Sequence, residues 1–354
     1  MRKNYTLLTN NIRTKKNPEG LILEKSFQAE LSTISKSDIL VFIRTAMKGV
    51  EPEYTAKSIE AGEKVKEHLR SVLSDVDYKY QGSVMTNTHI KGYSDIDLLA
   101  ITNKFYTRDI SRVKQILENY DQRQRFNDAS IRKLENENNL GFYHGDSLKD
   151  LLVNRLESER KMKETYKDCN TEKPIAIKIN NLNLHREVDI VIANWYDDVR
   201  SIINNRGDYR GVQIYNKEEH AKGEADYPFL SISRINDKSS LTNGRLKKMI
   251  RFLKHCKAES QYQIGLTSFD INAICYAIDA KDYADLSFYD LVPILYLQLK
   301  RINEDSNYAD TLMSVDGREP IFRFDSEKKE NLKQMLAEVE GIYFDLLESK
   351  KAII

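Results

Sequence analysis

The chain has 354 residues, which at about 150 residues per domain indicates two domains or lobes. Its 55 Lys and Arg residues face 54 Asp and Glu residues, so the net charge is only +1. This balance argues against a strongly basic protein that coats long nucleic acid, and against an acidic disordered tail. With 40% hydrophobic residues, a chain of this length can bury a sizeable core.

The cysteines and the apolar segments bear on the compartment. The 3 cysteines lie far apart and form no C-x-x-C pair, which argues against a disulfide framework and favours a reducing environment. No stretch approaches the roughly 18 apolar residues of a membrane span. The residues after Met1 lack the apolar segment of a secretory signal. We therefore expect a soluble, cytoplasmic protein without a membrane partner.

The first half of the chain predicts helices followed by strands. Residues 1–25 are polar and predict a flexible leader. Apolar residues at helical spacing predict a helix over about 27–47 and a long amphipathic helix over 53–74. Weak alternation over 76–80 predicts a strand, and the apolar run within 94–102 predicts a second strand that is buried on both faces.

The second half changes from a sheet to helices. The segment 107–168 is charged and helical, with a loop around 136–145. Strands are predicted at 174–179 and 187–193, a mixed loop at 211–244, and helices at 244–259, 267–280, 287–303 and 326–351. This pattern divides the chain into the leader 1–25, a sheet-containing lobe 26–215 and a helical lobe 216–354.

Two aspartates at the start of the second strand carry the strongest chemical signal. Residues i and i+2 of a strand point to the same side, so Asp95 and Asp97 present carboxylates about 7 Å apart. Two like charges at this distance are stabilised by a hard divalent cation such as Mg²⁺ or Mn²⁺. A single D-x-D pair is also common on exposed strands, so the pair alone does not define a site.

Gly82 and Ser83 lie between the first strand and a predicted helix, and Thr86 and Thr88 extend the polar segment. Glycine permits close approach of a ligand to the backbone, and the free N–H groups of a helix N-terminus bind phosphate. A phosphate site next to a pair of metal-binding carboxylates is typical of nucleotidyl transfer by two metal ions.

This chemistry requires a third carboxylate on a neighbouring strand. Asp189 lies in an apolar run, where an unpaired charge is costly. Glu187 shares its strand face and is the alternative candidate. We favour Asp189 because both of its neighbours, Val188 and Ile190, are apolar.

The order Gly82-Ser83, then Asp95-Ile96-Asp97, then Asp189 resembles the signature of the polymerase-β-type nucleotidyltransferase superfamily. Within it the chain is most similar, over about residues 27–300, to the cGAS/DncV-like nucleotidyltransferases (CD-NTases) of bacterial antiphage defence (CBASS). The resemblance implies an α+β fold. A polymerase-β-like nucleotidyltransferase lobe, with a mixed sheet flanked by helices, would precede a C-terminal helical lobe of the oligoadenylate-synthase type, with helix 53–74 as the bridge. The loop after Gly82 departs from the family pattern because it lacks a second glycine.

Further matches lie in the helical lobe. By resemblance, Lys254 and Ser268 hold the triphosphate, as do Gly82 and Ser83, and Phe269 stacks on a base. Residues 245–257 contain basic residues and no acid, which suits a triphosphate. The alternatives are a solvated basic helix face for this segment and a core aromatic for Phe269.

The resemblance also implies a reaction. Asp95 and Asp97 would hold two Mg²⁺ (or Mn²⁺) ions, and Asp189 the ion that activates a ribose hydroxyl. Attack of this hydroxyl on the α-phosphate of a nucleoside triphosphate releases pyrophosphate. The product would be a cyclic di- or trinucleotide second messenger, made without a template and sensed by a separate effector. Long nucleic acid is not expected as an obligatory activator.

Two alternative functions remain open from the sequence. The enzyme could make linear DNA or RNA oligomers, or add nucleotides to a tRNA or a protein. The chain could also be a non-catalytic nucleotide-binding regulatory module, although the intact set of three aspartates argues against this.

Overall fold

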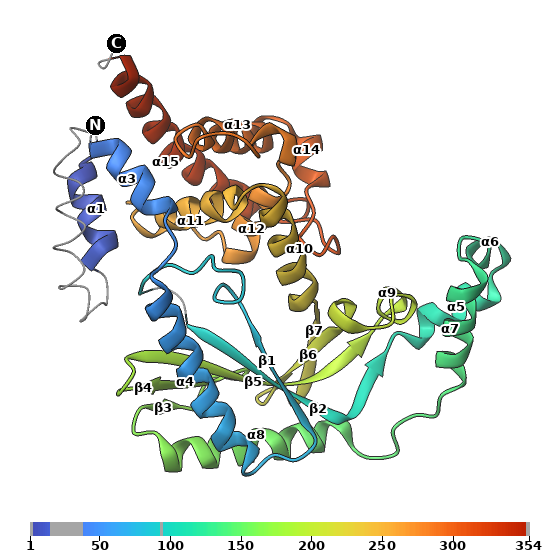
Figure 1. Cartoon of the computed structure of the whole chain (residues 1–354). Coiled ribbons are helices and arrows are strands. Elements are labelled where there is room, and N and C mark those ends of the chain that lie inside the picture. The colour runs from blue at the N-terminus through green and yellow to red at the C-terminus, as the bar shows by residue number, and fades with distance from the viewer. Residues whose placement is uncertain (1–2, 15–37, 93–94, 352–354) are drawn as a thin grey trace. The chain divides into compact units, whose positions relative to one another are not determined.

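The computed structural model describes residues 3–14, 38–92 and 95–351 (Figure 1). The chain divides into two compact units. The sheet unit contains residues 52–85 and 95–233, and the helical unit contains residues 1–51, 86–94 and 234–354. This division differs from the predicted boundaries at 25 and 215, because the N-terminal helices pack with the C-terminal ones, and sequence periodicity does not show such distant pairing.

The sheet unit is built on a seven-stranded mixed sheet in the order β1-β2-β5-β4-β3, with β6 pairing with β5 and β7. Its strands are β1 (Val76–Gln81), β2 (Ile96–Arg108), β3 (Cys169–Asn170), β4 (Ile177–Asn181), β5 (Arg186–Asp197), β6 (Gly211–Asn216) and β7 (Ala221–Asp226). Strands β2 and β5 are parallel, and the pairs β1–β2 and β4–β5 are antiparallel. The predicted mixed sheet is therefore confirmed.

The two faces of the sheet pack against different parts of the unit. Helices α4 (Pro52–Arg70) and α8 (Ser147–Thr165) share a core with one face, to which even-numbered residues of β2 and β5 contribute: Ile96, Leu98, Ala100, Val188, Ile190 and Ile192. Odd-numbered residues of the same strands form a smaller cluster on the other face: Leu99, Ile101, Val191, Ala193 and Trp195. Side chains at odd positions of β2 and β5 therefore point away from α4 and α8.

Helices α5 (Ile110–Glu118), α7 (Asp128–Asn139) and α9 (Val199–Ile203) form a separate small core within this unit. The short helix α6 (Tyr120–Arg123) follows α5 and has no buried residue. The sequence predicted helical structure from residue 107, but β2 continues to Arg108. The predicted loop around 136–145 is confirmed in part, because α7 ends at Asn139 and α8 begins at Ser147.

The segment 211–244, predicted as a mixed loop, is instead β6, β7 and most of α10 (Pro228–Leu241). Strand β7 has the sequence Ala-Lys-Gly-Glu-Ala-Asp and no buried residue. It is an edge strand held by hydrogen bonds to β6. A strand without a buried side chain carries no hydrophobic periodicity, which is why the sequence pattern missed it.

The helical unit contains α1 (Tyr5–Thr14), α3 (Asp38–Met47), α11 (Arg245–Ala258), α12 (Ser268–Tyr276), α13 (Leu291–Glu304), α14 (Ser306–Thr311) and α15 (Ser326–Lys351). Tyr5 and Ile12 of α1 are buried in the core that also contains Phe252 of α11. The part of the predicted flexible leader that the structure describes is thus a packed helix. Of the helix predicted over 27–47, α3 confirms the end, and its start lies outside the described residues.

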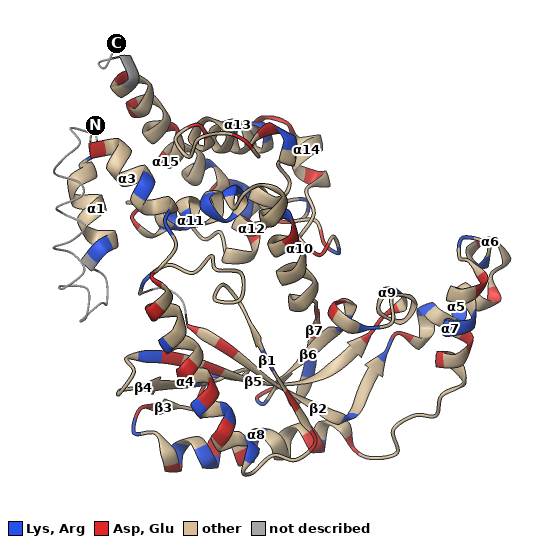
Figure 2. Ribbon diagram, in the orientation of Figure 1, with Lys and Arg blue, Asp and Glu red and all other residues tan. Residues whose placement is uncertain are grey.

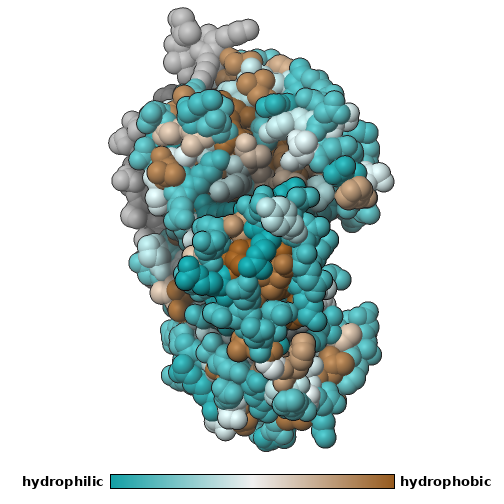
Figure 3. Space-filling view, turned by 90° about the vertical axis from the view of Figure 1, so that its right-hand side faces the viewer, coloured by the Kyte–Doolittle hydropathy of each residue, from teal (hydrophilic) through white to brown (hydrophobic). Residues whose placement is uncertain are grey.

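On the face drawn in Figure 3, hydrophilic residues predominate and hydrophobic residues form small separate patches. Among the residues that the structure describes, no helix is long and apolar enough to cross a membrane.

Candidate active site

A row of polar side chains crosses the centre of the sheet. Asp97 on β2 lies opposite Asp189 on the parallel neighbour β5. On the outer strands, Gln81 of β1 lies opposite Asp97, and Lys178 of β4 lies opposite Asp189. Paired residues of neighbouring strands point to the same face, so the two aspartates lie side by side on the face away from α4 and α8.

Two lysines contact the acids of this row. Lys178 Nζ lies 2.7 Å from Asp95 Oδ2 and 3.1 Å from Glu187 Oε2. Lys173 Nζ lies 3.6 Å from Asp189 Oδ2. The fold therefore brings the three predicted aspartates to one region, and Glu187, the alternative candidate, pairs with Lys178 rather than lying opposite Asp97.

The pKa values of the acids differ according to their neighbours. Burial, together with the charges of Asp189 and Asp95, raises the pKa of Asp97 to about 7. Burial also raises the pKa of Asp189, against the opposing charge of Lys173. At Asp95 burial acts in the same direction, but the hydrogen bonds of Lys178 and Glu187 and the charges of Lys178 and Lys173 together outweigh it and lower the pKa. Negative charge is thus least stable at Asp97, in the middle of the group.

The carboxylate oxygens of these aspartates are suitable ligands for a divalent cation. As placed, no three Asp, Glu, His or Cys side chains within residues 3–14, 38–92 and 95–351 form a ready-made metal cluster. However, Asp189 Oδ1 is buried and accepts no hydrogen bond, and burial together with the like charges of its neighbours raises the pKa of Asp97. A cation between carboxylate oxygens would relieve both, and these oxygens are the ligands that Mg²⁺ prefers.

Gly82 lies directly beside Asp97. Its φ is +81°, and a Cβ atom at this position would overlap the Asp97 carboxylate. Glycine is therefore required twice, for the left-handed backbone and for the close approach. This places the Gly82-Ser83 turn next to the candidate metal ligand, as the motif predicted.

The helix predicted after Gly82-Ser83 is wrong. Residues 83–87 are turns, and no helix begins in the described chain up to residue 92. Thr86 and Thr88 are buried, and their hydroxyls lie 2.8 Å apart in a mutual hydrogen bond. A helix N-terminus therefore does not contribute to phosphate binding here, and of the predicted polar residues Thr86 and Thr88 are turned inward.

In the helical unit, Lys and Arg recur along α11 (Figure 2). Lys254 is only 6% exposed, and burial lowers its pKa to about 8. Arg251 donates from Nε to Met47 O (2.9 Å) and from Nη1 to Asn87 O (2.6 Å). Arg251 and Lys254 are therefore buried basic residues and do not belong to a solvated helix face.

The start of α12 carries the other predicted nucleotide contacts. Thr267 caps this helix in a reciprocal hydrogen-bond pair with Asp270. Ser268, the first helical residue, is exposed, and Phe269 is partly buried against the core of the helical unit. Lys254, Ser268 and Phe269 belong to the helical unit and the aspartates to the sheet unit, so the contacts of these three residues with nucleotide stay predictions.

Comparison with known proteins identifies the family. The chain is 52% identical over 349 residues to a c-di-GMP synthase of Capnocytophaga granulosa, and the match covers 98% of both proteins. The chain belongs to the cGAS/DncV-like nucleotidyltransferases. Residues 233–343 match the C-terminal helical domain of this family.

Solved structures agree with this assignment. The STING-associated CdnE c-di-GMP synthase of Capnocytophaga granulosa has a TM-score of 0.80 at 47% identity, covering 98% of this chain and 99% of that one. The corresponding enzyme of Flavobacteriaceae sp. has a TM-score of 0.86 at 36% identity, with the same coverage. These relatives confirm the predicted family, its fold class, a nucleotidyltransferase activity and the synthesis of a cyclic nucleotide messenger.

Sequence reasoning missed the basic residues around the acids of this CD-NTase. Lys178 could have been found, because the alternation Ile177-Lys178-Ile179 places the lysine on the face opposite the core. Arg155 had no such signal. It is fully buried on α8 and donates to the carbonyl oxygens of Thr171 (3.2 Å) and Lys173 (2.8 Å), which fixes the loop that carries Lys173.

Proposed function

We propose that this CD-NTase makes cyclic di-GMP from two molecules of GTP, without a template and with release of pyrophosphate. The observation that carries this proposal is the identity of 52%, 42% and 39% to three proteins named c-di-GMP synthase, each over more than nine tenths of the chain. The carboxylates of Asp95, Asp97 and Asp189, called the acid row below, supply the chemistry that such an enzyme requires.

Asp95, Asp97 and Asp189 would hold the two Mg²⁺ or Mn²⁺ ions. When bound, such ions neutralise the polyphosphate and make a ribose hydroxyl a better nucleophile. The chain contributes rigidity, because Asp97 and Asp189 are on adjacent hydrogen-bonded strands whose opposite face is packed against α4 and α8. Gly82 lets the following turn approach Asp97 closely, where Ser83 would contact phosphate.

Lys254, Ser268 and Phe269 would bind the nucleotide. Burial lowers the pKa of Lys254 because it destabilises the charged form of the side chain. A triphosphate bound nearby would stabilise this charged form. The exposed Ser268 hydroxyl can donate to phosphate oxygens, and the accessible part of Phe269 can stack on a base.

The product would act on a separate effector. The similar solved enzymes are described as STING-associated, so we propose a STING-type receptor of the cyclic dinucleotide, within an antiphage (CBASS) system in the cytoplasm. A net charge of +1 supports activity without long nucleic acid as an obligatory activator.

Product identification tests this function. The full chain is incubated with GTP alone, ATP alone and all four NTPs, with Mg²⁺ or Mn²⁺, and the products are treated with phosphatase and identified by mass spectrometry. We expect a phosphatase-resistant cyclic di-GMP from GTP alone. A ladder of linear products would contradict cyclisation, and a mixed or adenine-only cyclic product would contradict the choice of base.

A further inference from the structure

The sheet unit contains a cavity of about 450 Å³ that the acid row does not use. Its walls come from the end of β2, the loop between α7 and α8, and β7: Asn103, Lys104, Phe105, Tyr106, Thr107, Arg108, Ile110, Gly141, Phe142, Tyr143, Gly145, Ser147 and Lys222. Asn103 follows Asp97 by six residues, about 20 Å along a strand. The volume lies within the range of small-ligand sites.

A bulge in β2 opens this cavity. Thr102 pairs with Asn194, and the next pair along β5 joins Tyr106 to Trp195. The backbone of residues 103–105 is therefore not paired with β5 in the strand register, and all three residues line the cavity. Bulges of this kind redirect side chains and occur preferentially next to binding sites.

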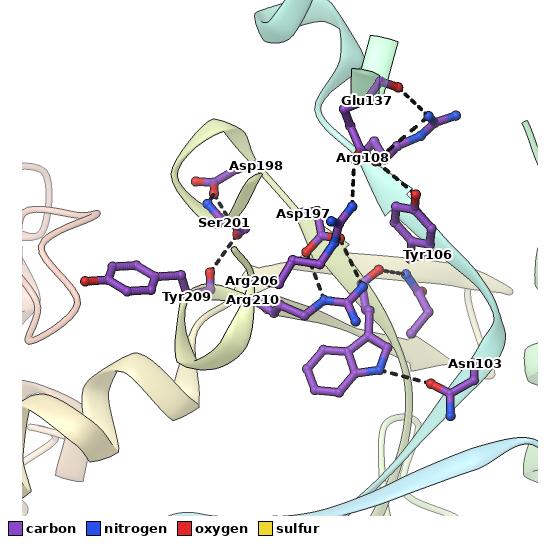
Figure 4. Close-up of polar contacts among 12 residues, drawn as sticks. Asn103, Tyr106, Arg108, Glu137, Asp197, Asp198, Ser201, Arg206, Tyr209 and Arg210 are labelled. Atoms are coloured by element: carbon purple, nitrogen blue, oxygen red, sulfur yellow. Dashed lines mark hydrogen bonds and ion pairs between the residues drawn. The ribbon is translucent and has the colours of Figure 1, made fainter. Parts of the chain in front are cut away.

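Buried ion pairs make one wall rigid (Figure 4). Arg206 lies 2.9 Å from the fully buried Asp197 and 2.7 Å from Glu137, which also accepts a hydrogen bond from Tyr106 (2.9 Å). Arg108 donates to the carbonyl oxygens of Glu137 and Gly141, each at 2.8 Å. The loop that follows α7 is thus fastened to β2, and the cavity wall is preformed.

An exposed aromatic ring lies on this wall. Phe142 is 68% exposed, and the Arg108 guanidinium lies 5.0 Å from its ring centre. On the same loop Tyr143 stacks on Phe105 with ring centres 5.2 Å apart. A large exposed phenylalanine, fixed beside a guanidinium on the wall of a cavity, offers a stacking surface for a planar ring.

A cation without an acidic partner also lines the cavity. Lys222 Nζ donates to Thr107 Oγ1 (3.2 Å) and lies 5.5 Å from the centre of the Phe105 ring. Among the described residues no carboxylate forms an ion pair with it, whereas Lys104 pairs with Asp150 at 3.1 Å. Burial lowers the pKa of Lys222, so a bound anion would stabilise its charged form.

We propose that this cavity is a second nucleotide site, in which the base stacks on Phe142 and a phosphate pairs with Lys222. A mononucleotide and a cyclic dinucleotide share this chemistry, and the test distinguishes them. The proposal does not depend on the reaction at the acid row.

Trp195 provides a reporter, because it is the only tryptophan of the chain and its Nε1 donates to Asn103 Oδ1 (3.3 Å) on the cavity wall. The full chain, in EDTA to suppress metal-dependent binding at the aspartates, is titrated with GMP, cyclic di-GMP or inorganic phosphate. Binding is followed by tryptophan fluorescence and by equilibrium dialysis of labelled ligand. The variants are Lys222→Met and Phe142→Ala, with the exposed Lys149→Met as the matched control.

We expect saturable binding of one of the two nucleotides, weakened about tenfold by Lys222→Met and by Phe142→Ala, and unchanged by Lys149→Met and Asp97→Asn. The nucleotide that binds more tightly, GMP or cyclic di-GMP, is then identified as the ligand class of the cavity. Absence of nucleotide binding overturns the proposal. The proposal is also overturned if Phe142→Ala leaves the nucleotide affinity unchanged, or if inorganic phosphate binds as tightly as the nucleotide. A loss of affinity in Asp97→Asn as large as that in Lys222→Met would overturn it too.

Discussion

The acid row of the sheet unit and helix α11 of the helical unit both concentrate like charges in partly buried positions. The two regions differ in the counter-charges that balance these groups. Lys178 and Lys173 approach the acids at 2.7 and 3.6 Å, so the sheet unit provides its own counter-charges. Lys254 on α11 has no ion pair with a described carboxylate, and burial lowers its pKa. Metal ions bound at the acids would replace the lysine counter-charges, whereas the charge of Lys254 would be balanced only by the predicted ligand.

The largest effect is expected from Asp97→Asn, which removes the carboxylate shared by the two predicted metal sites. We expect the rate of product formation to fall by about 10³-fold or more, because several kcal/mol of metal-dependent stabilisation are lost. Thermal stability should stay equal or rise, since a like charge next to Asp189 and Asp95 is removed. Chromatographic rate measurements and thermal unfolding test both parts.

The matched control is Asp77→Asn, an exposed aspartate on the neighbouring strand β1. It should retain wild-type turnover. Equal activity of Asp97→Asn and the wild type would show that the acid row is not the metal site.

The second prediction concerns stability against pH in metal-free protein. The folded-state pKa of Asp97, about 7, lies above its unfolded value near 4, so the folded state binds more protons between these values. The free energy of unfolding should therefore fall as pH rises from about 4 to about 7, by at most about 4 kcal/mol from this group. Urea unfolding across this range measures the effect.

Asp97→Asn provides the reference, because its stability should lack this component of the pH dependence. Saturating Mg²⁺ should offset the loss at pH 7 in the wild type and have less effect in the variant. Parallel pH profiles of the two proteins without metal would contradict the raised pKa.

The helical unit gives the third prediction. Lys254→Met should raise the KM for GTP about tenfold with a smaller change in kcat, because the variant lacks the charge that is proposed to contact the triphosphate in the ground state and the transition state alike. The variant should also unfold at a higher temperature than the wild type, since a buried lysine is replaced by an apolar side chain. Lys248→Met, on the same helix and less buried, is the control. A higher melting temperature without a change in KM would assign Lys254 a purely structural role.

These regions also differ in how much their sequences revealed. The acid row was predictable because strand geometry fixes which residues share a face: Asp97 and Asp189 were assigned from spacing and apolar flanks, and the register β2–β5 pairs them. The turn after Gly82 was not, since a mutual hydrogen bond between Thr86 and Thr88 has no local signature.

Long-range pairing explains the other differences. Tyr5 of α1 lies against the Phe42 ring of α3 and shares a core with Phe252, both far along the chain, so the polar sequence of α1 alone indicated a leader. The edge strand β7 has no buried residue, and Arg155, a charged residue in a charged helix, gave no sign that it is fully enclosed. Local patterns therefore predicted elements with one apolar face and failed where distant backbone groups supply the partners.

The smallest effect is expected from Lys178→Met, which tests whether the sheet unit's own cation competes with metal. Lys178 bridges Asp95 and Glu187 at 2.7 and 3.1 Å, but these side chains are 27–31% exposed, so the ion pairs are partly screened. Without the lysine charge, Mn²⁺ should bind the full chain about threefold more tightly, measured by electron paramagnetic resonance of free Mn²⁺ without substrate. Lys79→Met, an exposed lysine on β1, should leave the affinity unchanged. Weaker Mn²⁺ binding in Lys178→Met would mean that the lysine positions Asp95 for the metal instead of competing with it.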